Sequence, residues 1–545
     1  MTIIHNPVLP GFHPDPSLCR AGSDYYLVTS TFEYFPGVPV FHSADLVNWR
    51  QIGYCLTRKS QLNLDRLPPS CGIFAPTIRF HNGAFYMITT LVGGGGNFYV
   101  TTQDPAGPWS EPVWVDREMF DPSLFFDEDG KVYYTRRGER GIVQAEIDIT
   151  TGKLLTPLRM IVEKYICTDI EGPHLYKIRG QYYLMAAEGG TRFGHCEVIG
   201  RSEGPWGPFE PCPHNPFLTH RDQSHPPIRD TGHAELIEDA AGNWWLFCLG
   251  TRHLRYDSAT ILGRETFLSP LTWKDGWPWI ENNHLISESF ETRLLPPQVP
   301  SPTLWRDDFD QSTLDLGWNF LRNPYEADWS LTEQPGCLRL KGSAVSLQDW
   351  DSPAFIGRRQ EHFKVEASCQ VAFEPRAENE EAGLTVLMSN LFHYDLAVAL
   401  RQGSRRVVLK KRVGDIVQEI VSPPVAPGPL VLWVEADGLE YRFSYQEIGE
   451  QDSLTPTPLP RGEGILNSPP PSGEGLGVRE PLPPAPYPLG SGLARLLSSE
   501  LAGPSDSASI FTGMYFGLYA TGNGQPCQAP ADFDWFKYKK AGSAL

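Results

Sequence analysis

Three carboxylates and one histidine stand at equivalent positions of repeated segments. Asp15 and Asp121 each begin the sequence DPSL, Glu171 begins EGPHL and His233 begins HAEL. Each precedes, by ten to twelve residues, the first aromatic residue of a strand-like segment, and Ala75 in APTI holds this position in a fifth segment. If these sequences form the innermost strands of repeated sheets, their register gathers three carboxylates and an imidazole at one place.

Three clustered carboxyl groups can hydrolyse a glycosidic bond with inversion. One carboxylate activates water and a protonated carboxyl, roughly 6.5–9.5 Å away, protonates the leaving oxygen. A third carboxylate raises the pKa of that acid by like-charge repulsion. Glu171 has the longest reach and is the expected acid, whereas spacing alone does not separate Asp15 from Asp121. A turn capped by the Asp of each DPSL explains the repeat equally well.

Five segments have the composition of buried strands that follow a tight turn. Between their first aromatic residues the spacings are 60, 48, 49 and 62 residues. The segments are SDYYLVTS (23–30), GAFYMITT (83–90), GKVYYTRR (130–137), GQYYLMAA (180–187) and GNWWLFCL (242–249). Repeats of this size suit a propeller, whose blades are four-stranded sheets of about 40–50 residues. We therefore expect an all-β protein in which residues 1–300 form a five-bladed β-propeller.

A second all-β domain is predicted for residues 301–545. The proline-rich residues 291–309 are typical of a linker, and later segments such as HFKVEASCQVAF and LVLWVEA alternate with period two. This alternation predicts a β-sandwich. Residues 456–488 contain eleven prolines in 33 positions. Such a segment cannot bury enough apolar surface to order itself, so we expect a disordered insertion over 451–505.

Composition limits the partners of the chain. The formal net charge is −19, which argues against nucleic acid and against anionic membrane surfaces. The ten cysteines are scattered singly, so neither a zinc site nor a disulfide framework is expected. The N-terminal sequence lacks the basic and apolar regions of a signal peptide, and we expect a cytoplasmic protein. The sequence leaves the oligomeric state open, a homo-oligomer included.

Six motifs of the chain together resemble glycoside hydrolase family 43. They are GFHPDPS (11–17), TSTFEYFPGVPVFHSADLVNW (29–49), FDPSLFFDEDG (120–130), DIEGPHLYK (169–177), TGHAEL (231–236) and LGRETF (262–267). They look most like the β-xylosidases of that family, which carry a C-terminal β-sandwich of jelly-roll, concanavalin-like type. The resemblance covers the chain apart from the proline-rich insertion. It implies an inverting exo-enzyme on a five-bladed propeller, and some family members also release α-L-arabinofuranose.

The resemblance also implies roles for the three carboxylates. Asp15 in FHPDPS matches the general base of the family, and Glu171 in EGPH matches the general acid. Asp121 in FDPSLF matches the carboxylate that orients the acid and tunes its pKa.

Further residues are implied to bind substrate. Arg264 in LGRET matches an arginine that binds sugar hydroxyls, and Phe32 and Phe74 match walls of the sugar subsites. Relatives often have Trp at the position of Phe74, which leaves the leaving-group preference open. Phe511 in IFTG matches an aromatic residue that the sandwich extends towards the pocket.

His233 completes the predicted substrate site. We expect it to be a hydrogen-bonded channel histidine rather than a metal ligand, because no second ligand stands at metal-binding spacing. No metal site and no required cofactor are predicted. Some family members hold a calcium ion near this position, which the sequence neither requires nor excludes.

The sequence thus predicts a β-xylosidase that releases D-xylose from the non-reducing ends of β-1,4-xylooligosaccharides. An α-L-arabinofuranosidase, or an enzyme with both activities, could use the same carboxylates, because one or two pocket contacts decide this specificity. A carbohydrate-binding protein without activity and a scaffold that docks through the proline-rich segment are more distant alternatives. A binding protein without activity would not need all three carboxylates, and a docking scaffold would not explain why they stand at equivalent repeat positions.

Overall fold

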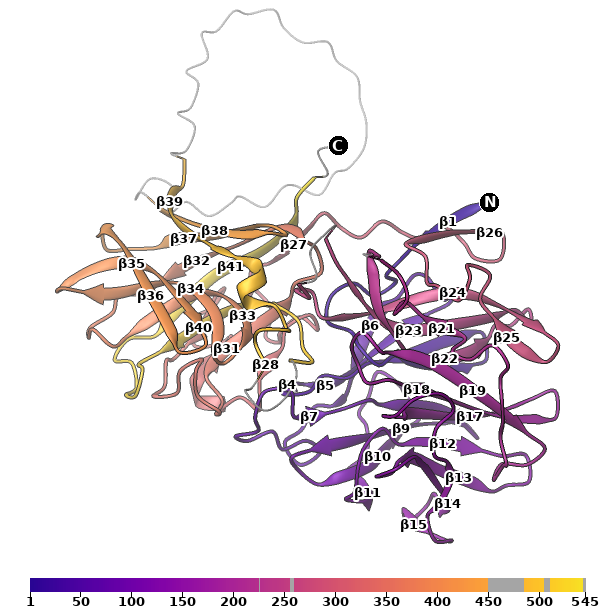
Figure 1. Ribbon diagram of the computed structural model, residues 1–545. Coiled ribbons are helices and arrows are strands. Elements are labelled where there is room, and N and C mark those ends of the chain that lie inside the picture. Colours follow the sequence, from indigo (N-terminus) through magenta and orange to yellow (C-terminus); the bar gives the residue numbers. More distant parts are fainter. Residues whose placement is uncertain (225, 255–258, 449–484, 504–509, 543–545) are drawn as a thin grey trace, which may run out of the picture.

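The computed structural model describes residues 1–224, 226–254, 259–448, 485–503 and 510–542. Within these ranges the regular secondary structure is almost entirely β-strand, and the helical elements are two short 3-10 turns, η1 (Glu326–Asp328) and η2 (Ala494–Leu497). None of the described helices is long and apolar enough to span a membrane. A propeller and a β-sandwich lie side by side (Figure 1). The prediction of an all-β propeller followed by a sandwich is confirmed.

Each of the five propeller blades is an antiparallel sheet built from one continuous stretch of chain. The first two blades contain β2 (Ser17–Ala21), β3 (Asp24–Val28), β5 (Gly37–Ser43) and β6 (Arg50–Leu56), then β7 (Gly72–Ile73), β8 (Thr77–His81), β9 (Ala84–Val92), β10 (Gly96–Thr102) and β11 (Val113–Asp116). The third contains β12 (Ser123–Phe126), β13 (Val132–Arg137), β14 (Ile142–Asp148), β15 (Lys153–Leu154) and β16 (Arg159–Val162). The last two contain β17 (Glu171–Ile178), β18 (Gln181–Glu188), β19 (Cys196–Ser202), β20 (Glu210–Pro211) and β21 (Leu218–Thr219), then β22 (Ile228–Glu238), β23 (Trp244–Arg252), β24 (Arg264–Lys274) and β25 (Trp277–Trp279).

The inner strands form a closed ring around the propeller axis. β2 contacts β8 and β22, β8 contacts β12, and β17 contacts both β12 and β22. The five aromatic segments form the second strand of each blade, namely β3, β9, β13, β18 and β23. The residues that precede them by ten to twelve positions therefore stand at or in the inner strands, as the repeat register requires.

Buried carboxylates close the ring where the first and last blades meet. Glu235 on β22 accepts a hydrogen bond from the amide of Leu18 at 2.6 Å, and Glu265 on β24 accepts one from the amide of Gly11 at 2.7 Å. Outside the blades, β1 (Thr2–His5) pairs with β26 (Ser289–Thr292). The two blades share no sheet, and the ends of the propeller are joined by side-chain hydrogen bonds, by this short pairing and by an isolated antiparallel bridge between Leu9 and Thr266.

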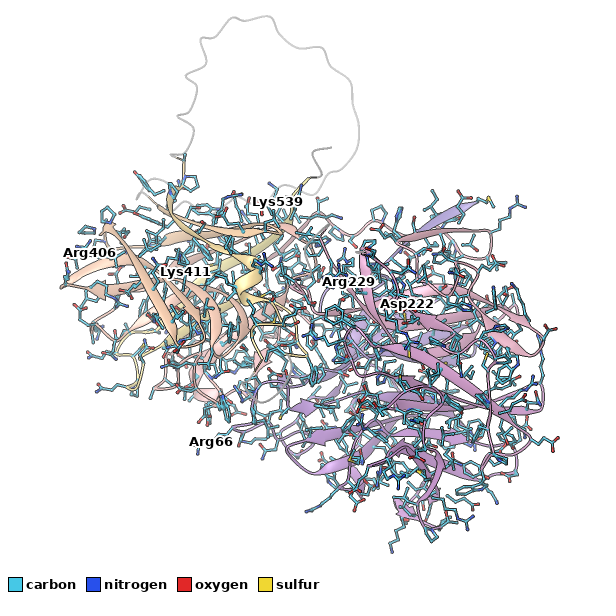
Figure 2. The ribbon with its side chains drawn as sticks, viewed as in Figure 1. Arg66, Asp222, Arg229, Arg406, Lys411 and Lys539 are labelled. Carbon is cyan, nitrogen blue, oxygen red and sulfur yellow. The ribbon has the colours of Figure 1, made fainter. Side chains whose placement is uncertain are left out.

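The sandwich packs two antiparallel sheets over one apolar core. The larger sheet contains β27 (Leu304–Asp307), β29 (Trp329–Ser330), β30 (Leu338–Leu340), β32 (Lys364–Ala372), β37 (Leu430–Asp437), β38 (Glu440–Glu447), β39 (Tyr487–Leu493) and β41 (Ala531–Lys540). The six-stranded sheet contains β31 (Ala354–Arg359), β33 (Glu381–Ser389), β34 (Phe392–Arg401), β35 (Ser404–Val413), β36 (Ile416–Pro424) and β40 (Tyr515–Thr521). Figure 2 shows Arg406 of β35 at the end of the sandwich away from the propeller.

The expected disordered insertion over 451–505 is wrong for its C-terminal part. Residues 487–493 form β39, which pairs with β38 so that Tyr487 lies opposite Tyr445, and η2 follows directly. The strand forms although it contains a proline because it lies at the edge of its sheet, where a missing N–H costs no ladder bond. Residues 449–484 lie outside the described residues, and for them the prediction stays untested.

The two domains are joined by contacts between their backbones and side chains. β4 (Tyr34–Phe35) of the propeller pairs with β28 (Phe320–Leu321), and the ring of Tyr34 stacks on that of Tyr515 with centroids 4.0 Å apart. Arg322, 1% exposed, donates from Nε to the carbonyl of Leu67 at 2.8 Å. The sandwich is thus held firmly against the propeller, next to the strands that carry the predicted site.

Candidate active site

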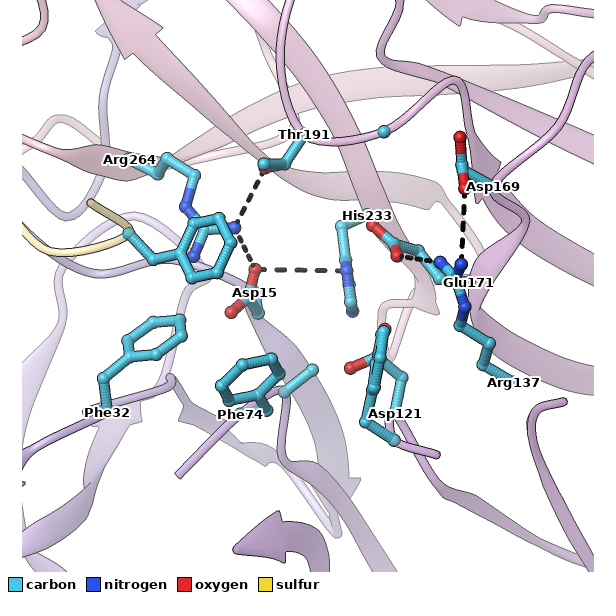
Figure 3. Close-up of a pocket in the computed structure, with 14 residues that line it drawn as sticks. Asp15, Phe32, Phe74, Asp121, Arg137, Asp169, Glu171, Thr191, His233 and Arg264 are labelled. Atoms are coloured by element: carbon cyan, nitrogen blue, oxygen red, sulfur yellow. Dashed lines mark hydrogen bonds and ion pairs between the residues drawn. The ribbon is translucent and has the colours of Figure 1, made fainter. Parts of the chain in front are cut away.

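A pocket of about 220 Å³ lies where the inner strands meet the sandwich (Figure 3). All eight predicted site residues line it. The lining consists of Asp15, Phe32, Phe74, Ala75, Phe120, Asp121, Arg137, Asp169, Glu171, Gly190, Thr191, His233, Arg264 and Phe511. The repeat register therefore located the pocket correctly, with residues of all five blades brought together.

The backbone aims three of these side chains through an uncommon conformation. Asp15, Asp121 and His233 have φ angles of 55°, 56° and 47°, in the left-handed region that non-glycine residues rarely adopt. A register shift in β22 on both sides of Gly232 accompanies the turn at His233, as expected of a bulge that re-aims a side chain. Such conformations cost about 1–3 kcal/mol each and cluster at functional sites.

Asp15 is 4% exposed and is held by polar partners. Arg264 donates from Nη1 to its Oδ1 at 3.0 Å, and the hydroxyl of Ser30 donates to its Oδ2. The Nδ1 atom of His233 lies 3.9 Å from the same Oδ1. Both oxygens of the Asp15 carboxylate thus contact donors, which fix its orientation in the pocket.

Asp121 and Glu171 lie in a different electrostatic environment. Burial raises the pKa of Asp121 well above its usual value, and the charges of Glu171 and Asp15 raise it further. Burial also raises the pKa of Glu171, against the opposing effect of Arg137, whose Nη1 lies 2.7 Å from Oε2. Because the two carboxyls titrate as an interacting pair, the pocket retains a proton at a pH where isolated carboxyls have lost theirs.

Aromatic rings form an apolar wall beside the carboxylates. The rings of Phe32 and Phe74 lie 5.1 Å apart, and Phe511 of the sandwich lies 5.6 Å from Phe32 and 6.0 Å from Phe74. The guanidinium of Arg264 lies over Phe32 and Phe511, at 5.5 and 5.4 Å. The wall offers rings to the C–H faces of a sugar, while Arg264 presents donors to its hydroxyls.

An ion pair and hydrogen bonds join the propeller to Glu500 and Phe511 of the sandwich. The carboxylate of Glu500 accepts from the amide of Thr260 at 3.0 Å, from its hydroxyl at 2.6 Å and from Arg192 at 2.8 Å. The amide of Phe511 in turn donates to the hydroxyl oxygen of Ser70 at 2.9 Å. The carbonyl of Ser499, next to Glu500, accepts from the amide of Ile510 at 3.1 Å, so these contacts link the propeller to the position of Phe511.

His233 packs closely against the turn that carries Glu171. A Cβ atom on Gly172 would lie 2.9 Å from its ring, so only glycine fits there, and Gly172 has a φ of 58°. Burial lowers the pKa of His233, which favours its neutral form. Among the described residues, no group of three or more His, Cys, Asp and Glu side chains is placed to hold a metal ion.

Sequence reasoning missed four polar or aromatic residues of the pocket. Arg137 bridges Glu171 and Asp169, at 2.7 and 3.3 Å, and its guanidinium lies 5.0 Å from the ring of Phe120. Thr191 accepts from Arg264 at 3.2 Å. Arg137 ends a repeated strand and Asp169 stands two residues before Glu171, so comparing strand ends across the repeats could have found both. No repeated pattern marks Thr191.

Two family models together account for most of the chain. The model "Glycosyl hydrolases family 43" matches residues 4–278. The chain belongs to this family. The model "Beta xylosidase C-terminal Concanavalin A-like domain" matches residues 306–460 and 488–539 of this family 43 enzyme. The protein is therefore a glycoside hydrolase, as the sequence predicts.

Relatives of this family 43 enzyme have related but different names. A non-reducing end α-L-arabinofuranosidase of Bacteroides ovatus is 42% identical over 98% of this chain and 94% of its own. A xylosidase/arabinosidase of Butyrivibrio fibrisolvens is 41% identical over 80% of this chain and 87% of its own. The solved xylan β-1,4-xylosidase of Bacillus halodurans superimposes with a TM-score of 0.85 at 32% identity, covering 98% of this chain and 100% of that one.

Proposed function

We propose that this glycoside hydrolase removes single D-xylose residues from the non-reducing ends of β-1,4-xylooligosaccharides, with inversion. The observation that carries this proposal is that the carboxyl groups of the pocket lie in different electrostatic environments. Asp15 is held by cationic and hydroxyl donors, whereas burial raises the pKa of both Asp121 and Glu171. A base and an acid side by side are what single-step hydrolysis of a glycoside needs.

In this proposal Asp15 is the general base and Glu171 the general acid. Asp15 takes a proton from a water molecule, whose oxygen attacks the anomeric carbon on the face opposite the leaving group. Glu171 gives its proton to the leaving oxygen as the glycosidic bond breaks. Asp121 interacts electrostatically with Glu171, and we place the proton that this pair retains on Glu171, because its longer side chain reaches further towards the leaving oxygen.

The pocket residues that carry no proton in this mechanism hold the sugar. Arg264 and His233 offer polar atoms to the hydroxyls, and Phe32, Phe74 and Phe511 contact the ring. The volume of about 220 Å³ suits one sugar unit, which favours an exo mode of action. Water and these side chains suffice for the step, so we propose no required cofactor.

A second candidate activity is the release of α-L-arabinofuranose. It is favoured by the arabinofuranosidase of Bacteroides ovatus, whose similarity extends over 98% of this chain. Both sugars are pentoses, and discrimination between them depends on few contacts. An enzyme with both activities fits the same site.

The test compares 4-nitrophenyl β-D-xylopyranoside, 4-nitrophenyl α-L-arabinofuranoside and xylobiose as substrates of the wild type and of Asp15→Ala. With the wild type we expect xylose from xylobiose, and from the aryl xyloside we expect it first as the α-anomer in the proton NMR spectrum, because inversion converts a β-linkage into an α-product. The variant should lose about 10²–10⁴-fold in kcat. Near-normal turnover by the variant would overturn the role of Asp15, and arabinose release alone would favour the second candidate.

A further inference from the structure

The six-stranded sheet of the sandwich carries a second polar hollow, on the face turned away from the apolar core. In β33, β34 and β35 the residues Glu381, Asp395 and Lys410 belong to this face, while their neighbours in sequence, such as Leu396 and Leu409, are buried in the core. Asp395 lies opposite Lys410 in the strand register. Tyr519 of β40 lies on the same face, because it pairs with Gly383, two residues after Glu381.

The hollow has a volume of about 190 Å³ and is separate from the proposed active site. Its lining consists of Ser346, Leu347, Gln348, Glu381, His393, Asp395, Lys410, Arg412, Val417, Tyr519, Thr521 and Asn523. None of these residues lines the pocket around Asp15. The space is that of about six water molecules, at ~30 Å³ each, which is sufficient for one pentose or hexose ring.

Charged groups in the hollow are buried and balanced in sign. Asp395 is 2% exposed and Glu381 3%, and they face the cations Lys410 and Arg412. Burying charge is costly unless it is paired, and here Lys410 pairs with Glu381. An anion would meet two carboxylates and a cation would meet two cationic groups, so the lining suits a neutral ligand.

Two buried polar atoms of the lining have no hydrogen-bond partner among the described residues. The Nδ1 atom of His393 lies 2.8 Å from Asp395, while its Nε2 atom is unpartnered. The hydroxyl of Tyr519, which is 1% exposed, is unpartnered too. Leaving such groups unpaired costs about 1–3 kcal/mol each, which a ligand with hydroxyl groups would recover. A sugar hydroxyl can donate to a ring nitrogen and accept from a phenol, while Val417, 48% exposed, offers an apolar surface to C–H groups.

We propose that this hollow is a second saccharide site, which binds a neutral sugar unit away from the catalytic pocket. The polar groups of His393, Tyr519, Lys410 and Arg412 hold its hydroxyls. Because the occupant is a pentose unit of the kind that the active site is proposed to cleave, its identity rests on the proposed function. The existence of the site rests on the hollow alone.

Equilibrium dialysis with radiolabelled xylobiose tests the proposal. The protein is the full chain with Asp15→Asn, which prevents hydrolysis while leaving the hollow intact. We expect two molecules bound per chain, and in Asp15→Asn/Tyr519→Phe we expect the weaker-bound molecule to lose about 3–10-fold in affinity, because one hydrogen bond is removed. In Asp15→Asn/His393→Phe the second molecule should be lost. One bound molecule in all three proteins would overturn the proposal.

The melting temperature distinguishes a ligand site from a structural network. Tyr519→Phe removes a buried hydroxyl without a partner among the described residues, so its Tm should be unchanged or higher. Tyr394→Phe is the matched control on the same sheet, since its hydroxyl donates to the carbonyl of Leu493 at 3.0 Å, and it should lower Tm without affecting binding. A fall in Tm for Tyr519→Phe with unchanged binding would contradict the proposal, as would binding of inorganic phosphate that His393→Phe abolishes and that xylobiose does not displace. Xylose release by Asp15→Asn would instead refute the proposed base and leave the hollow untouched.

Discussion

Asp15 and Asp121 show how a turn residue and a pocket residue can be one and the same. Their shared DPSL sequence left a capped turn and a catalytic carboxylate as alternatives, because both explain the pattern. In the structure both residues adopt left-handed turns, with φ of 55° and 56°, and both carboxylates line the pocket. The left-handed turn points each carboxylate into the pocket. The sequence could therefore predict where the two residues lie, but it could not decide between a capped turn and a catalytic carboxylate.

At the residue scale, Glu171→Gln separates leaving-group protonation from the rest of catalysis. We expect a loss of about 10²–10⁴-fold in kcat on xylobiose and a much smaller loss on an aryl xyloside with an acidic phenol, because only the poor leaving group needs a proton. The raised pKa of Glu171 sets the upper pH limit of wild-type activity, so the variant should lose that limb of the aryl-substrate profile.

Initial rates of Glu171→Gln and the wild type, measured from pH 4 to pH 9 on both substrates, give the losses in kcat and the shape of the pH profile. Asp169→Asn is the matched control, since it alters the other carboxylate bridged by Arg137 and carries no proton in the mechanism. Equal losses on the two substrates would show that Glu171 is not the acid.

At the element scale, a buried carboxyl at the junction of β4 and β28 makes the fold sensitive to pH. Glu33, 2% exposed, accepts from the amide of Ser70 at 2.9 Å, and Arg322 opposes the effect of burial on it. Burial raises the pKa of Glu33 from 4.5 to about 7. Below pH 4.5 the group is protonated in both folded and unfolded chains, and between pH 4.5 and 7 only the folded chain keeps the proton. Stability therefore falls as the pH rises through this range.

Glu33→Gln should remove the loss of folding stability that ionisation of Glu33 causes as the pH rises. The shift of 4.5 to about 7 corresponds to about 3 kcal/mol above pH 7, since one pKa unit is worth ~1.4 kcal/mol. We expect the variant to melt at the wild-type temperature at pH 4.5 and above it at pH 8, measured by differential scanning calorimetry. A difference in Tm that does not grow with pH would contradict the assignment.

A second prediction at this scale concerns the segment that carries Phe511. Glu500→Ala removes the acceptor of Thr260 and Arg192, so the aromatic wall should lose its anchor. We expect KM for xylobiose to rise about 3–10-fold with a smaller change in kcat, because Glu500 does not itself line the pocket. Glu163→Ala, which breaks the exposed ion pair with Arg140, is the control and should change neither constant. Unchanged KM in Glu500→Ala would show that Phe511 is placed without this contact.

At the scale of the whole molecule, the sequence repeats made the architecture predictable. Contacts that occur only once in the molecule could not be predicted. The aromatic segments gave the blades because each blade repeats the same buried second strand. The anchor of Phe511 and the pairing of β28 with β4 join residues far apart in sequence, and no local pattern marks them. Proline content predicted disorder over 487–493, where pairing with β38 outweighs local propensity.

The pairing of β38 with β39 predicts that the segment between them is dispensable. Tyr445 lies opposite Tyr487 in an antiparallel register, a geometry that a short turn can close. Replacing residues 449–484 by Asn-Gly should leave kcat/KM within about twofold and Tm unchanged or higher, since shorter loops cost less closure entropy. Calorimetry and xylobiose hydrolysis measure both. A large fall in Tm would show that the segment contributes to the fold.

The closure of the propeller ring has a consequence for the order of folding. Each blade is local in sequence, but the bonds of Leu18 to Glu235 and of Gly11 to Glu265 join residues 217 and 254 positions apart. Contacts of such high sequence separation form slowly, because the intervening chain must be ordered first. Asp15 lies between Gly11 and Leu18, so the proposed base takes its place only with the last step of ring closure. During refolding, recovery of xylosidase activity should therefore lag behind the formation of β-structure.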